Sequence, residues 1–326
     1  MEWPVIYMKK NKLKEINNLV VVVLGTTSSG KTALGVKLAD YFNGEIISAD
    51  SRQVYVGMDI GTGKDLKEYI IKKKIKGKSV VKKIPYHLID VIKPQAKFSL
   101  VRYQKLALKA IDNILQRQKL PMIVGGTGLY LQAVVDNYQL DIHRPDARKR
   151  LELEKLNIDE LFERLKGINK VFAEKLNNSD RHNSRRLVRY IEILEANQDF
   201  RPKTKTGQYD FLLLGLDWPK EILNKRIRER LSARLEEGLV AEIKNLHNQG
   251  VSWKRLESFG LEYKFVARYL QDKIDYEEMA DKLSLAICQF AKRQKTWWKR
   301  WEKQGRKINW VNNLQEAKES IKKRLQ

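Results

Sequence analysis

The sequence has few of the residues that define several common classes of protein. Cys288 is the only cysteine among 326 residues, which excludes an intrachain disulfide and a zinc site built from several cysteines. The longest uninterrupted apolar run falls far short of the ~20 residues that span a bilayer. The opening residues Met1 to Pro4 lack the pattern of a signal peptide. We therefore expect a cytoplasmic protein.

Acidic residues are scarce relative to basic ones. The chain has 40 Asp and Glu residues against 64 Lys and Arg residues, for a formal net charge of +24. Solubility alone does not require such an excess, so the composition favours a polyanionic partner, with a generally basic surface as the alternative. A hydrophobic content of 42% is typical of a globular protein with one large core or two smaller ones.

A complete phosphate-binding loop follows directly after the β-branched run Leu19–Leu24. Its glycines let successive backbone N–H groups point into one concavity, closed by the N-terminus of a helix that begins near Lys31. Lys31 adds a point charge for the terminal phosphate, and the Thr32 hydroxyl is the usual ligand of Mg²⁺. The residues expected to bind a diphosphate, of a nucleotide or of another ligand, are Gly25, Thr26, Thr27, Ser28, Ser29, Gly30, Lys31 and Thr32.

Two further strands are expected to end beside this loop. Residues after Lys31 have apolar positions at helical spacing, Gly44 is expected to end that helix, and a strand follows that ends in Asp50. In such βαβ units the ligand lies at the carboxyl ends of the strands, which places Asp50 next to the phosphate loop. A third strand, residues 121–124, ends in the glycine-rich run Gly125–Gly128 instead of the aspartate common in P-loop ATPases; Asp90 is an alternative source of that carboxylate.

Changes of composition divide the rest of the chain. A lysine-rich stretch, residues 72–83, is interpreted as a solvated hairpin or loop, and Ser99 as the cap of an amphipathic helix. Residues 137–183 are charged and Leu-rich at helical spacing, which predicts an inserted helical subdomain. A strand at 211–216 returns to the sheet, and the chain is helical nearly to its end from Lys220. The expected core is therefore 17–136 with 184–326.

Basic residues gather in three places. Residues 291–307 hold eight basic residues, one acidic residue and three tryptophans, of which Trp297 and Trp301 share a helical face. Docking of that face on the core is favoured over stacking on bases, while the basic residues suit contacts with a phosphate backbone. Arginines at helical spacing form the other clusters, at 181–189 and at 226–230, where Arg226 and Arg230 are placed to clamp a diphosphate.

Taken together, these motifs resemble the tRNA dimethylallyltransferase family, also called tRNA isopentenyltransferases, over about residues 19 to 310. The ordered set is far more specific than a phosphate loop alone. It consists of Gly25–Thr32, Asp50–Tyr55, Gly57–Lys64, Pro85–Asp90, Gly125–Tyr130, Arg185–Arg189 and Ala291–Trp297.

The resemblance implies an RNA-binding prenyltransferase that modifies tRNA. It would transfer the dimethylallyl group of dimethylallyl diphosphate to N6 of the adenine beside the anticodon (position 37), with Mg²⁺ and without nucleotide hydrolysis. The implied fold is α/β, a P-loop NTPase-like parallel sheet core flanked by helices, with an inserted helical subdomain and a helical C-terminal region. We expect a monomer whose partners are the tRNA anticodon stem-loop and dimethylallyl diphosphate.

The expected site follows from the residues and this resemblance. Asp50 is the candidate general base, with an N-cap or metal-shell role as the alternative, and Thr127 is expected near it. Lys31, Thr32 and Arg226 complete the catalytic set. The residues expected to contact tRNA are Asp50, Ser51, Arg52, Gln53, Thr127, Arg148, Arg185, Arg186, Leu187, Val188, Arg189, Lys292, Arg293 and Gln294.

One segment departs from the family pattern. Where the family usually carries Gly-Tyr followed by Lys or Arg, this chain has residues 258–263 with Glu262 in place of the positive charge. Three alternatives stay open on sequence grounds: a small-molecule kinase with lid arginines, a non-catalytic RNA-binding P-loop protein, and a family variant that prenylates free adenine nucleotides. The missing carboxylate after strand 121–124 disfavours the first, and the basic aromatic helix disfavours the last.

Overall fold

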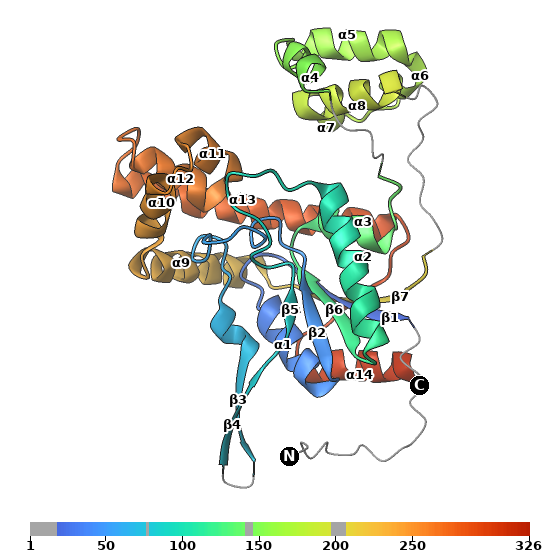
Figure 1. Cartoon of the computed structure of the whole chain (residues 1–326), viewed down its shortest axis with the longest axis vertical. Helices are drawn as coiled ribbons and strands as arrows, with labels where there is room; N and C mark the ends of the chain where they lie inside the picture. Colours follow the sequence, from blue (N-terminus) through green and yellow to red (C-terminus); the bar gives the residue numbers. More distant parts are fainter. Residues whose placement is uncertain (1–17, 76–77, 141–145, 197–206) are drawn as a thin grey trace. The chain divides into compact units, whose positions relative to one another are not determined.

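The computed structural model describes residues 18–75, 78–140, 146–196 and 207–326. The chain divides into two compact units, one formed by 1–136 with 207–326 and the other by 137–206. The first unit contains the sheet and the second is helical (Figure 1).

The first unit is built on a six-stranded parallel sheet with the order β5-β2-β6-β1-β7-β8. Its strands are β1 (Leu19–Gly25), β2 (Gly44–Ser48), β5 (Tyr86–His87), β6 (Leu120–Gly125), β7 (Asp210–Leu216) and β8 (Ile308–Trp310). Every residue of the three neighbouring strands β1, β2 and β6 is buried. A parallel sheet covered on both faces requires such continuous apolar runs, and this is why the sequence of β1 does not alternate.

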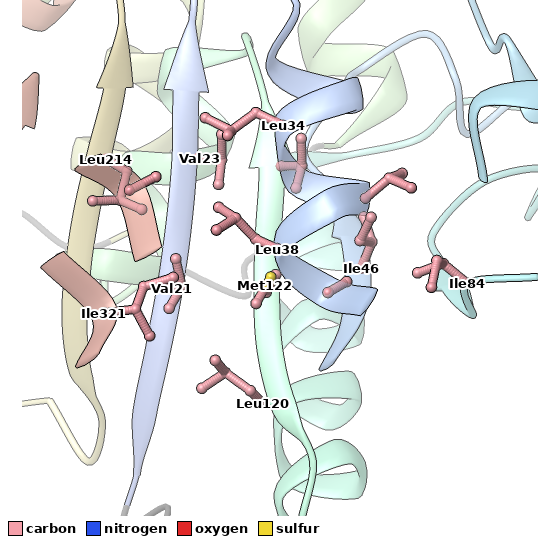
Figure 2. Packing of buried hydrophobic residues seen from close by; sticks show 14 of the residues in the cluster. Val21, Val23, Leu34, Leu38, Ile46, Ile84, Leu120, Met122, Leu214 and Ile321 are labelled. Carbon is pink, nitrogen blue, oxygen red and sulfur yellow. The ribbon is translucent and has the colours of Figure 1, made fainter. Parts of the chain in front are cut away.

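Helices cover each face of the sheet. On one face, α1 (Lys31–Tyr41) and α14 (Leu314–Leu325) pack on alternate residues of β1, β6 and β7, as Figure 2 shows for Val21, Leu38 and Met122. On the other face, the buried side chains of α2 (Leu100–Gln116), α3 (Gly128–Val135) and the long helix α13 (Tyr276–Lys303) contact Val20, Val22 and Leu24. The Ser99 side chain caps α2 by accepting a hydrogen bond from the Arg102 backbone N–H at 3.2 Å.

A second core lies among the C-terminal helices of the same unit. It joins α9 (Lys220–Glu236), α10 (Leu239–Asn248), α11 (Trp253–Phe259) and α12 (Leu261–Tyr269) to the first half of α13. Apolar residues of the 54–58 loop after β2 enter this core as well. The C-terminal helices are thereby fixed over the carboxyl ends of the strands.

The lysine-rich stretch forms an antiparallel hairpin of β3 (Ile70–Ile75) and β4 (Lys78–Lys83), which follows the short 3-10 helix η1 (Leu66–Tyr69). The second unit has its own apolar core. Its helices are α4 (Ala147–Leu153), α5 (Ile158–Ile168), α6 (Lys170–Glu174), α7 (Asn178–Arg181) and α8 (Ser184–Ala196).

Two expectations need correction. The helical subdomain was expected to end at 183, but the compact unit extends to 206 because the apolar face of α8, with Leu187 and Ile191, packs into its core. Gly44 does not end α1: Asn43 takes the left-handed conformation there, with φ of 53°. Gly44 opens β2, where a Cβ would lie 2.6 Å from the Leu120 carbonyl oxygen.

Candidate active site

A cavity of about 910 Å³ opens at the carboxyl ends of β1, β2 and β6. The loops after these three strands form one side, and α9, the 259–265 segment and α13 form the other. Burial of the three strands on both faces explains why their polar terminal residues all meet at this edge. The cavity therefore contains both the phosphate loop and the predicted base.

The phosphate loop is held closed by contacts from outside it. Gly30, with φ of 88°, turns the chain into α1, and the Lys31 ammonium donates to the Thr26 carbonyl oxygen at 3.1 Å. The amide of Gln294 on α13 accepts from the Thr27 N–H at 2.8 Å and donates to the Gly126 carbonyl at 2.8 Å. Gln294 thus ties the loop after β1 to the loop after β6.

Helix α9 fixes the loop from the opposite side. The Arg226 Nε donates to the Ser28 carbonyl at 2.8 Å, and its guanidinium lies 5.2 Å from the ring centroid of Trp218. The Trp218 indole in turn donates to the Ser29 carbonyl at 2.9 Å. Arg226 and Arg230 both line the cavity, as predicted. A half-buried guanidinium beside a ring of backbone N–H groups is suited to an anion.

Burial and neighbouring charges shift the pKa values of several groups that line the cavity. Burial, reinforced by Arg230, lowers the pKa of Lys31 to about 8. Burial also lowers the pKa of Arg230, with Arg234 as the next cause. Conversely, burial raises the pKa of Glu68 and of Glu262 on the cavity wall. A bound polyanion would stabilise the charged forms of Lys31 and Arg230.

Asp50 and Thr127 lie together on the cavity wall at the ends of β2 and β6. The Asp50 Oδ1 accepts from the Arg52 N–H at 2.8 Å, and the Thr127 Oγ1 accepts from the Ser51 N–H at 3.1 Å. The two side chains are therefore anchored to the same short turn. This arrangement offers a fixed carboxylate and a hydroxyl to a ligand in the cavity.

Within the described residues, no group of three His, Cys, Asp or Glu side chains is placed to hold a metal ion. Thr32, however, lines the cavity at the start of α1 together with Asp50. Because Mg²⁺ commonly takes few protein ligands and completes its shell with water and phosphate oxygens, these residues fit a Mg²⁺ that arrives with a diphosphate.

Several residues predicted to contact tRNA are engaged within the core unit. The Gln53 amide donates to the Gly63 carbonyl at 3.0 Å and accepts from the Ser48 hydroxyl at 2.9 Å. Gln294 is buried in the bridge described above. By contrast, Lys292 and Arg293, which directly precede Gln294 on α13, are exposed. Ser51 and Arg52 line the cavity with Asp50.

The helical unit corrects two further predictions. Leu187 and Val188 are buried in its core, so their side chains are not available to RNA. Arg185 and Arg148 are exposed. Arg186 forms an ion pair with Asp180, and Arg189 lies 3.2 Å from Glu192.

Two functional pairs of residues escaped the sequence prediction. Arg234 on α9 and Glu262 on α12 form a buried ion pair on the cavity wall, 3.5 Å apart. Glu242 on α10 accepts from the backbone N–H groups of Ile60 at 2.6 Å and Gly61 at 3.1 Å, and from the Tyr263 hydroxyl at 2.7 Å. The four-residue spacing from Arg230 to Arg234 was the only available signal for the first pair.

The basic aromatic helix docks through its tryptophans, but the fully buried pair is not the predicted pair of Trp297 and Trp301. Trp298 and Trp301 are buried against the sheet, 6.3 Å apart between ring centroids, whereas Trp297 is half-buried. The Lys64 ammonium, from the glycine-rich segment after β2, is also buried and pairs with Asp59 at 2.6 Å and with Asp90. Asp90 is therefore held in an ion pair with this segment.

The sheet, the phosphate loop and the carboxylate beside it define an α/β enzyme of P-loop architecture. The family described as IPP transferase matches residues 53–301. The chain belongs to this family.

Individual relatives agree over nearly the whole chain. It is 44% identical to tRNA dimethylallyltransferase 1 of Geotalea uraniireducens (strain Rf4) over 307 residues, which cover 93% of this chain and 97% of the relative. It is 46% identical to tRNA dimethylallyltransferase 2 of Treponema denticola over 301 residues, covering 89% and 95%. The crystal structure of the full-length tRNA isopentenylpyrophosphate transferase from Bacillus halodurans has a TM-score of 0.66 at 33% identity, covering 95% of this chain and 97% of that one.

Proposed function

We propose that this enzyme transfers the dimethylallyl group of dimethylallyl diphosphate to N6 of adenine 37 in tRNA and releases diphosphate. The family match over residues 53–301 and relatives above 40% identity make the chain a tRNA dimethylallyltransferase. The observation that supports the chemistry is that the phosphate loop and the Asp50–Thr127 pair share one cavity.

The phosphate loop would act on the leaving group, the diphosphate. The carbon under attack is allylic, so its bond to the diphosphate can break with positive charge delocalised over the prenyl group. The loop N–H groups, Lys31, Arg226 and Arg230 would stabilise the negative charge that grows on the diphosphate. Thr32 would hold a Mg²⁺, with Asp50 close by. When bound, the ion supplies further neutralisation of the phosphate oxygens.

The nucleophile requires a proton acceptor. The N6 amine of adenine is weakly nucleophilic because its lone pair is delocalised into the ring, and it loses a proton as the new bond forms. Asp50, anchored by the Arg52 N–H, is the group we assign as general base. Thr127, anchored on the same turn, would orient the amine.

The adenine must leave its stack to reach the cavity, at a cost that contacts with the RNA backbone offset. Lys292 and Arg293 are exposed on α13 and directly precede the buried Gln294 of the bridge, so we assign them to the phosphate backbone. In the helical unit we assign Arg148, Arg185, Arg186 and Arg189 to RNA. We propose that the enzyme acts as a cytoplasmic monomer. No helix in the described ranges is long and apolar enough to cross a membrane.

The proposal is tested by transfer of radiolabel from dimethylallyl diphosphate to unmodified tRNA in the presence of Mg²⁺ and in the absence of ATP. We expect transfer that ceases on chelation of Mg²⁺ and that is unaffected by added ATP. A requirement for ATP hydrolysis would show instead that the phosphate loop holds a nucleotide.

A further inference from the structure

Arg234, in the last turn of α9, has unused hydrogen-bonding capacity on the cavity wall. It is only 8% exposed. Its Nη1 lies 3.5 Å from the Glu262 Oε1, while its Nη2 has no hydrogen-bond partner among the described residues. A buried N–H group without a partner carries a desolvation penalty, and such groups in native structures point to a missing ligand.

The surroundings of Arg234 connect it to the phosphate loop. A small recess is lined by Thr27 and Ser28 of the loop, by Arg230 and Arg234 of α9, and by Glu262. Arg230 and Arg234 are one helical turn apart, and burial together with the nearby Arg234 lowers the pKa of Arg230. Two cations are thus held together beside the loop, Arg234 within 3.5 Å of Glu262 and the partly exposed Arg230 within 3.5 Å of Asp65.

Gly63 makes room for both guanidinium groups. It has φ of 62°, and a Cβ at this position would lie 1.8 Å from the Arg234 Nη2 and 2.1 Å from the Arg230 Nη2. The ends of the two arginines therefore meet at the same point on the cavity wall. Both are aligned by this backbone before a ligand arrives.

Glu262 balances the charge of Arg234 in the empty site. Burial raises the pKa of the Glu262 carboxyl, and Arg234 is the largest opposing influence. Because the ion pair of Arg234 and Glu262 adds no net charge, the buried guanidinium of Arg234 is tolerated next to Arg230. The carboxylate pairs with Nη1 of the guanidinium, and Nη2 is left without a hydrogen-bond partner among the described residues.

We propose that Arg234 is an additional diphosphate-binding residue and that Glu262 is its counter-anion in the empty site. The inference rests on the proposed function, because it takes the diphosphate to be the ligand of the phosphate loop. Position 262, where the family usually carries a positive charge, then carries the anion, while the adjacent Arg234 of α9 supplies the cation.

The test measures the dissociation constant of inorganic diphosphate with Mg²⁺ by calorimetry. Arg234→Met keeps a long side chain but removes the guanidinium, so we expect affinity about 10- to 100-fold weaker, the range of charge-assisted hydrogen bonds. Arg228→Met is the matched control: Arg228 lies on the same helix, is exposed and does not line the cavity. It should bind diphosphate as the wild type does.

Arg234→Met leaves Glu262 buried and unpaired, which could prevent folding. A second variant keeps the test decisive in that case. The double variant Arg234→Met, Glu262→Gln removes both charges, and its comparator is Glu262→Gln alone. We expect the double variant to bind diphosphate more weakly than Glu262→Gln, and more tightly than Arg234→Met where that variant folds, because the repelling carboxylate is gone.

Equal diphosphate affinity in Arg234→Met, Arg228→Met and the wild type would overturn the inference and leave Arg234 a structural residue. So would equal affinity in the double variant and Glu262→Gln. Failure of the proposed function is distinguishable, because in that case the wild type itself transfers no dimethylallyl group to tRNA.

Discussion

At the scale of single residues, Lys31 combines a structural contact with a charge that the empty cavity disfavours. Its ammonium is bonded to the Thr26 carbonyl, yet burial and Arg230 hold its pKa at about 8. A diphosphate would reverse the balance by adding negative charge next to the ammonium. Binding of the diphosphate is therefore expected to take up a proton above neutral pH.

This gives a pH dependence with a definite sign. The pKa of Lys31 is higher in the bound state than in the free state, so affinity is complete below the free-state pKa and falls as pH rises through about 8. The slope should approach about tenfold per pH unit. Calorimetric titration with inorganic diphosphate at a series of pH values measures it, and Lys31→Arg, which keeps its charge, should bind with a flatter profile. A wild-type profile as flat as that of Lys31→Arg would contradict this assignment.

Asp50 gives the second prediction at this scale. Asp50→Asn keeps the shape of the side chain and an oxygen to accept the Arg52 N–H, but it cannot take the proton of the amine. We expect single-turnover transfer to fall ~10²–10⁴-fold, with little change in affinity for tRNA or dimethylallyl diphosphate. Preserved single-turnover chemistry together with a large loss of either affinity would make Asp50 a binding or metal-shell residue.

The sequence predicts some of these residues and misses others for a physical reason. Asp50 and Thr127 follow buried strands, and the rule that ligands bind at the carboxyl ends of parallel strands brings them together. The Arg234–Glu262 pair depends on how α9 packs against α12, and the Gln294 bridge on how α13 crosses the loops. Packing between helices far apart in the chain leaves no local pattern in the sequence.

At the scale of elements, α13 combines two roles on different faces. One face is buried, with Trp298 and Trp301 in the sheet core and Gln294 on the phosphate loop. Lys292 and Arg293 lie on the exposed face. The periodicity of the sequence predicted that Trp301 docks, but it paired Trp301 with Trp297 in place of Trp298 and did not distinguish the buried Gln294 from its exposed neighbours.

The exposed face predicts a salt dependence. Each phosphate contact that is lost should reduce the slope of log affinity against log salt by about one unit. We therefore expect Lys292→Gln and Arg293→Gln each to weaken tRNA binding and flatten its salt dependence. Lys318→Gln on α14, which contacts the Tyr41 ring, is a control that should keep the wild-type slope. A slope equal to that of the wild type in the α13 variants would make these residues ordinary surface charges.

At the scale of the whole molecule, the sequence predicted a parallel sheet with a helical insertion, but the predicted end of the insertion was wrong. The break at 137 was visible as a change of composition, whereas the return was expected at 183 and the unit continues to 206. The arginines of α8 suggested an RNA-binding helix of the core. Their helix instead buries Leu187, Val188 and Ile191 inside the insertion, a use of its apolar face that composition could not reveal.

The net charge of +24 belongs to the molecule as a whole, and it favours a tRNA substrate over a free nucleotide. The most direct measurement offers the enzyme labelled dimethylallyl diphosphate together with unmodified tRNA and AMP in one reaction, then maps the label. We predict label on N6 of adenine 37 of the tRNA and none on AMP. Label on AMP, or on neither acceptor, would contradict the proposed function.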